Sequence, residues 1–255
     1  MIKKYFILLI LSSISIYGQG EANNWFFGNG AGLHFDANGN VTSLPNGQIF
    51  TTEGCSSISS ASGDLLFYTD GRTVWDRNHV KMPNGDYFAG RGLFGDPSST
   101  QSGIIIPKPG NPDVYYIFTV DEPHHENAAT YPNRNTAPTM DEDDGFNNGF
   151  NYSIVNLSVV GNNGSIGNVT TRNTHLITYD PNPNGEEIKY KCSEKITAVQ
   201  HGDGVSFWAI THFIDNFYAF KINSTGINNN PIKSNCQMNI PVNGYHANAI
   251  GYLKA

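Results

Sequence analysis

The chain has 255 residues, of which 22 are acidic and 15 are basic, and its formal net charge is −7. The basic residues form no cluster, which argues against a nucleic-acid partner held through phosphate contacts. Aromatic residues make up 12% of the chain and charged residues only 15%. Because no stretch has helical periodicity, we predict an all-β protein.

Residues 1–19 are typical of a secretory signal peptide. Lys3 and Lys4 precede an apolar run at 5–11, and small and polar residues follow up to Gly18. The apolar run is shorter than the roughly 20 residues of a membrane-spanning helix, and no later segment reaches that length. We therefore expect an exported chain, extracellular or on the outer cell surface, with no transmembrane segment after cleavage.

Residues 63–85 predict a β-meander. Two strands, at 65–69 and 73–76, are joined by Asp70-Gly71, a dipeptide that supplies the positive φ of tight hairpin turns. The first of these strands has no polar face, so we expect neighbours to cover both of its sides. Strict alternation places two sets of its side chains on opposite faces: Leu66 and Tyr68 on one, and Leu65, Phe67 and Thr69 on the other.

Similar turn-and-strand units recur along the chain. We expect the other strands at 23–28, 30–36, 102–107, 114–121, 150–159, 175–179, 195–201, 205–212, 216–223, 236–241 and 246–254. Residues 122–149 lack apolar periodicity and are expected to form an inserted loop. Once this insertion is subtracted, the units repeat about every 50 residues, which is the period of four-stranded propeller blades. We therefore predict that residues 20–255 form part of a β-propeller of four-stranded antiparallel blades; the alternative is a β-sandwich.

The acidic run at 141–144 is a candidate calcium site, with Asp141, Asp143 and Asp144 as ligands. Calcium takes hard oxygen ligands, and a cation would relieve the repulsion between neighbouring carboxylates. The spacing does not fit an EF-hand, so a solvated acidic loop tip is the alternative. We expect no other cofactor.

The three cysteines allow one disulfide within the chain. We pair Cys192 with Cys236, since they flank the two edges of one expected sheet. Cys55 is expected to be a small buried packing residue. The cysteines have no Cys-x-x-Cys spacing, which argues against a structural zinc site.

Two groups of titratable residues could support chemistry. Asp70 with Asp121 or Glu122 could form a carboxylate pair of the glycosidase type, because a propeller brings loop acids together around its axis. His124 and the two residues after it could bind a metal, but adjacent side chains on an extended chain point to opposite sides. A solvated loop start is the alternative for that segment.

Two further motifs have simpler structural interpretations. Residues 96–100 (Asp-Pro-Ser-Ser-Thr) lack a nucleophile elbow, so an Asx turn leading into a strand is expected. We expect Trp75 and Trp208 to pack in the blades rather than to serve as platforms for sugar stacking.

Several segments together resemble a known family. They are Trp25-Phe26-Phe27-Gly28-Asn29 and residues 63–71, 74–79, 82–85, 95–102, 194–199 and 250–254. They look like the N-terminal propeller-like region of large secreted Bacteroidetes proteins, which continue into sandwich modules and end in a gliding-motility-associated sorting domain of the type IX secretion route.

The resemblance implies that further C-terminal domains follow in the full-length protein and that the module has no assigned catalytic activity. We expect a non-catalytic surface module for adhesion or structural display, which binds a glycan or a protein partner. The alternative is a carbohydrate-active or other hydrolase with acidic residues at the propeller mouth.

Overall fold

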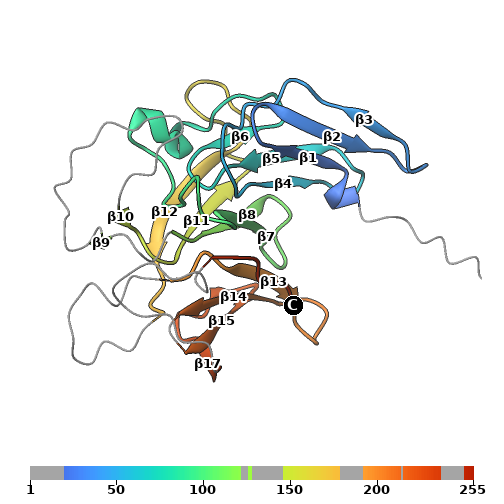
Figure 1. Ribbon diagram of the computed structural model, residues 1–255. Helices are drawn as coiled ribbons and strands as arrows, with labels where there is room; N and C mark the ends of the chain where they lie inside the picture. The colour runs from blue at the N-terminus through green and yellow to red at the C-terminus, as the bar shows by residue number, and fades with distance from the viewer. Residues whose placement is uncertain (1–19, 122–125, 128–145, 179–191, 214, 237–249) are drawn as a thin grey trace, which may run out of the picture.

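The computed structural model describes residues 20–121, 126–127, 146–178, 192–213, 215–236 and 250–255 (Figure 1). In this part of the chain the helical segments are three-residue 3-10 turns: η1 (Gly20–Ala22), η2 (Pro83–Gly85) and η3 (Tyr87–Ala89). No helix here has the length and apolarity to cross a membrane. The prediction of an all-β protein is confirmed. The expected signal peptide and most of the expected insertion lie outside the described residues.

Among the described residues, the strands form four antiparallel sheets in chain order. The first sheet contains β1 (Asn24–Phe27), β2 (Ala31–Phe35) and β3 (Val41–Ser43). The second contains β4 (Ser56–Ser59), β5 (Leu65–Thr69) and β6 (Val74–Asp76). In the third the order is β7 (Gly103–Pro107), β8 (Val114–Thr119), β11 (Asn151–Asn156) and β12 (Asn168–His175).

The fourth sheet contains β13 (Ile196–Gln200), β14 (Phe207–Phe213) and β15 (Asn216–Asn223). Two short strands, β16 (Gly226–Ile227) and β17 (Ile232–Asn235), both pair with β15. Apart from these sheets, β9 (Glu126–Asn127) pairs in parallel with β10 (Phe146–Asn147).

Successive sheets cover one another, because the central strands of the second and third sheets, β5 and β8, are apolar on both faces. Tyr68 of β5 packs with Phe26 of the first sheet, whereas Phe67 packs toward the third sheet. In β8, Ile117 faces the second sheet and Phe118 faces the fourth. The core therefore consists of three apolar layers between successive sheets, and the predicted burial of residues 65–69 on both sides is confirmed.

One detail of the predicted alternation in β5 is wrong. Leu66 packs against the cluster of Phe67, and Leu65 packs against the cluster of Tyr68. The pairing with β4 shifts between Ile58 and Ser59, which leaves Leu66 as an extra residue in β5. Such a bulge reverses the faces of the residues before it.

The predicted strand at 175–179 is wrong where the structure describes it, since residues 176–178 are irregular, and of the strand predicted at 236–241 the structure describes only Cys236. The edge strand of the third sheet, β12, ends at His175, and β17 ends just before Cys236. Both edge strands consist mainly of polar residues, so apolar alternation does not mark them. The described end of the strand predicted at 246–254, residues 250–254, is irregular.

The first strands of the last three sheets contact one another in succession: β4 contacts β7, and β7 contacts β13. Figure 1 shows these three strands one after another on the same side of the molecule. Within the described residues the sheets form an open series, and they close neither into a barrel nor into a ring.

Candidate functional site

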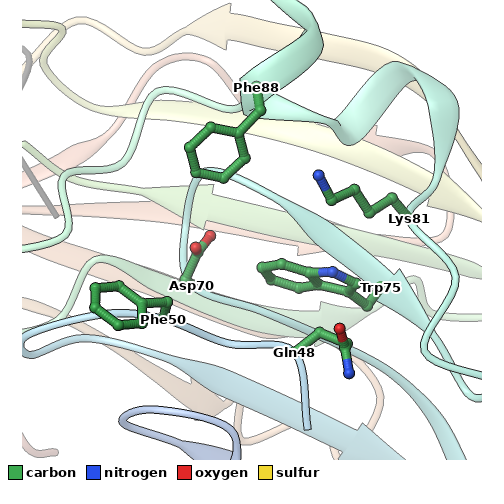
Figure 2. A pocket seen from close by; sticks show the side chains of 6 residues that line it. All are labelled: Gln48, Phe50, Asp70, Trp75, Lys81 and Phe88. Carbon is green, nitrogen blue, oxygen red and sulfur yellow. The ribbon is translucent and has the colours of Figure 1, made fainter. Parts of the chain in front are cut away.

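A cleft of about 290 Å³ lies between the second sheet and the segment that links it to the first sheet. Figure 2 shows the six side chains that line it: Gln48, Phe50, Asp70, Trp75, Lys81 and Phe88. They come from the linking segment, the turn between β5 and β6, strand β6, the loop after it, and η3. A concave surface that combines aromatic rings with a few polar groups is typical of a ligand site.

Trp75 forms the end of a stack of aromatic rings. Its ring lies 5.5 Å from that of Tyr68 with an interplanar angle of 12°, and the Tyr68 ring lies 4.5 Å from that of Phe26 at 20°. Trp75 is only 3% exposed, so its expected packing role is confirmed, and its ring also borders the cleft. The stack anchors this wall of the cleft in the core between the first two sheets.

The hydroxyl of Tyr68 fixes the rim of the cleft. It accepts a hydrogen bond from the Gln48 backbone N–H at 3.2 Å and lies 2.8 Å from His79 Nδ1. His79 Nε2 in turn lies 2.7 Å from the side-chain amide nitrogen of Asn46. Burial raises the pKa of the Tyr68 phenol, and burial lowers the pKa of His79. The Tyr68 phenol therefore stays neutral, and its hydroxyl holds the Gln48 backbone in place.

Asp70 lies in the predicted Asp-Gly turn and is 2% exposed. Its Oδ1 accepts hydrogen bonds from the backbone N–H groups of Arg72, at 2.8 Å, and Thr73, at 2.6 Å. Gly71 has the positive φ, 85°, that the turn requires. Burial raises the pKa of Asp70, while the charge of Arg72 opposes this shift.

Lys81 and Phe88 form the opposite side of the cleft. Lys81 is held beside Trp75 by a β-bridge, and its Nζ lies 3.1 Å from Asp86 Oδ1 and 5.0 Å from the centre of the Phe88 ring. Asp86 Oδ1 also accepts a hydrogen bond from the Phe88 N–H at 3.2 Å, which caps η3. One carboxylate thus positions both side chains.

Of the described members of the predicted carboxylate pair, Asp70 borders the cleft and Asp121 does not. Asp121 is fully buried, and its Oδ2 accepts a hydrogen bond from the Asn148 N–H at 2.6 Å. Glu122 and the predicted calcium ligands Asp141, Asp143 and Asp144 lie outside the described residues, as do the two histidines at 124 and 125. In the part of the chain that the structure covers, no group of three or more His, Cys, Asp or Glu side chains could hold a metal ion.

The turn predicted at 96–100 is confirmed. Asp96 Oδ1 accepts hydrogen bonds from the backbone N–H and the hydroxyl of Ser98, as in an Asx turn. Thr100 donates both its N–H and its hydroxyl to Glu194 Oε2, at 3.1 and 3.0 Å. This segment therefore ties the loop before the third sheet to the start of the fourth.

The three cysteines are thiols in the structure. Cys192 is fully buried, and Cys236 Sγ lies 3.2 Å from His212 Nε2. Cys55 is half-buried against the core between the first two sheets, and burial raises the pKa of its thiol to about 11, as suits a packing residue. The pairing of Cys192 with Cys236 stays a prediction, which mass spectrometry of the unreduced, alkylated chain tests.

Sequence reasoning missed four of the six lining residues: Gln48, Phe50, Lys81 and Phe88. They come from irregular segments and a single 3-10 turn, where no spacing or motif marks them. Only the packing of the loops onto Trp75 and Asp70 brings them together. The Met82-Pro83-Asn84-Gly85 turn just before η3 was the nearest signal in the sequence.

Comparison of the chain with protein-family models, with curated proteins and with solved structures gave no match.

Proposed function

We propose that this chain is a non-catalytic binding module and that the aromatic cleft is its ligand site. The observation that carries this proposal is the composition of the cleft wall: three aromatic side chains, one amide, one ammonium group and a single carboxylate line about 290 Å³. Such a wall suits binding through apolar contact and a few oriented hydrogen bonds.

The hydrogen bonds and surroundings of Asp70 support binding without catalysis. Glycoside hydrolysis needs two carboxyl groups on either side of the reacting bond. Asp70 Oδ1 already accepts two backbone hydrogen bonds, and among the described residues no second carboxylate lines the cleft. Asp70 therefore acts as a turn-forming residue that also offers polarity to a ligand.

We propose that the fold is part of a β-propeller, with the four sheets as successive blades. The third and fourth sheets each contain an antiparallel meander of four strands, β7-β8-β11-β12 and β13-β14-β15-β17. The first strands β4, β7 and β13 follow one another in contact, as inner strands do around a propeller axis. The cleft then lies between the first two blades.

We also propose that the chain is exported and acts at the cell surface, in adhesion or display. The support is the signal-like composition of residues 1–19 and the resemblance to secreted, gliding-motility-associated proteins. N-terminal sequencing of the protein recovered from outside the cells tests this: cleavage near residue 19 supports export, and an intact N-terminus inside the cells contradicts it.

A second candidate function is hydrolysis with Asp70 as a proton donor. Its support is that burial raises the pKa of this carboxyl, as in the acid of a glycosidase. A single assay separates the two functions. The purified chain is incubated with a panel of neutral and acidic polysaccharides, and new reducing ends are measured. We expect none; reducing ends that disappear in an Asp70→Asn variant would establish the hydrolase instead.

A further inference from the structure

The apolar part of the cleft consists of ring faces and edges. Figure 2 shows the Phe88 ring above Asp70, with Phe50 and Trp75 on either side of the carboxylate. Phe88 is 38% exposed, and Phe50 is half-buried, so both rings are accessible to a ligand. Trp75 closes the cleft from the core side because Tyr68 stacks on it. A ligand with flat apolar faces fits between such walls.

Opposite charges lie near one another around the cleft. The positive charge of the buried Arg72 stabilises the carboxylate form of Asp70. The ammonium group of Lys81 lies 3.1 Å from the carboxylate of Asp86. The two charged side chains that line the cleft, Lys81 and Asp70, therefore each have an opposite charge nearby. A charged ligand would lose hydration on entering without gaining an unpaired counter-charge, so the cleft favours a neutral ligand.

Two polar side chains lie at the edges of the cleft, and a third lies between its rings. The exposed side chain of Gln48 lies on the rim, Lys81 lies across from it, and Figure 2 shows the Asp70 carboxylate directed into the space between the rings. These groups supply hydrogen-bond donors and acceptors beside the aromatic rings. A pyranose ring has the matching chemistry, with C–H groups on its faces and hydroxyl groups around its circumference.

We propose that the cleft binds a neutral pyranose ring of a glycan. This proposal rests on the proposed function as a binding module and assigns the class of its ligand. The preference for a neutral ligand follows from the opposite charges beside Lys81 and Asp70, and the sugar ring follows from aromatic walls bordered by polar side chains.

The test compares three oligosaccharides of similar size that differ in charge: a galactose tetramer, the anionic galacturonic acid tetramer and the cationic glucosamine tetramer. Saturation-transfer NMR and titration of the chain's tryptophan fluorescence measure their binding. We expect the neutral tetramer to bind at least about tenfold more tightly than either charged one. Equal or tighter binding of a charged tetramer, or no binding of any of them, overturns the proposal.

Two variants test whether the neutral tetramer binds in the cleft. Phe88→Ala removes an accessible ring from the cleft and should weaken binding of the neutral tetramer at least about tenfold. The matched control is Phe94→Ala, since Phe94 is 39% exposed and does not line the cleft. Unchanged binding by Phe88→Ala, or an equal loss in both variants, contradicts a site in the cleft. Circular dichroism confirms that both variants fold.

A third variant tests the charge argument. Lys81→Met keeps the apolar stem but removes the cation, which leaves the carboxylate of Asp86 unbalanced. Selectivity should then shift toward the cationic tetramer by about three- to tenfold. Unchanged selectivity in this variant would contradict the inference that the ligand is neutral. Shortened oligosaccharides in the same samples would overturn the non-catalytic function while leaving the sugar assignment intact, so the two proposals fail separately.

Discussion

Tyr68 joins the core to the cleft, and each of its parts has a separate role. Its ring stacks between Phe26 and Trp75, and its hydroxyl bonds Gln48 and His79. The sequence predicted that Tyr68 is buried within a strand, because the strand is apolar on both faces. It could not predict the hydroxyl contacts, since both partners lie in loops whose path depends on tertiary packing.

Replacing Tyr68 by Phe should destabilise the chain by about 1–2 kcal/mol, because the Gln48 N–H and His79 lose their shared partner while the ring stack stays. Urea unfolding followed by fluorescence measures the change. Tyr252→Phe is the control: Tyr252 is 70% exposed, and its variant should stay within about 0.5 kcal/mol of the parent. Equal stability of Tyr68→Phe and the parent would contradict a structural role for the hydroxyl.

His79 should make stability depend on pH. Burial lowers its pKa in the folded chain below the ordinary value of 6.5, so the unfolded chain binds the proton more readily. Stability should therefore fall as the pH drops below about 6.5 and should stop falling below the folded pKa.

The raised pKa values of Asp70 and Glu194 act in the opposite direction, because the folded chain binds their protons more readily. Comparing urea midpoints of the parent and His79→Gln between pH 5 and pH 8 isolates the histidine. The parent should lose more stability than the variant on acidification. Parallel pH profiles would contradict this prediction.

At the scale of elements, the apolar strands were predictable, and the polar edge strands β12 and β17 were not. The strands β5, β8 and β15 carry enough apolar residues to be recognised, and the bounds predicted for β5 and β15 agree with the structure. The edge strands β12 and β17 are polar, since solvent covers their outer sides, and their pairing is decided by the neighbouring strand. The cleft depends on loops: the sequence marked Asp70 as a candidate site residue and Trp75 only as a packing residue, and it carried no signal for the other four lining residues.

The turn between β5 and β6 packs tightly against Ser102, the residue just before the third sheet. A Cβ on Gly71 would overlap Ser102, whose hydroxyl donates to the Asp70 carbonyl at 2.8 Å. Gly71→Ala should therefore destabilise the chain by about 2–4 kcal/mol, from both positive φ and steric overlap.

Gly39→Ala separates the two causes, because Gly39 has a φ of 80° and open space around it. This variant should cost only about 1 kcal/mol. Thermal unfolding of the two variants measures the difference, and equal losses would show that the contact with Ser102 contributes nothing.

At the scale of the whole molecule, the side chain of Gln101 connects segments that are far apart in sequence. Its Oε1 accepts hydrogen bonds from the Ile196 N–H at 3.0 Å and the Leu253 N–H at 2.8 Å. It thus holds the start of β13 and the segment 250–255 beside the loop that precedes β7. Such contacts near the first strands suit the proposed radial arrangement of sheets.

Gln101→Ala should leave both N–H groups without this acceptor and cost about 1–3 kcal/mol. Hydrogen exchange of the Leu253 amide, measured by NMR, should accelerate more than exchange within β15. Gln101→Glu keeps the accepting oxygen and should preserve most of the protection. Unchanged exchange in Gln101→Ala would contradict the connecting role.

The most direct measurement is a crystal structure of the chain grown with the neutral galactose tetramer. We predict one sugar ring in the cleft, in contact with Phe88 and hydrogen-bonded at the edge by Gln48, with β4, β7 and β13 adjacent around a common axis. A sugar bound elsewhere, or a cleft without sugar at saturating concentration, would contradict the central claim that this cleft is a binding site for a neutral glycan.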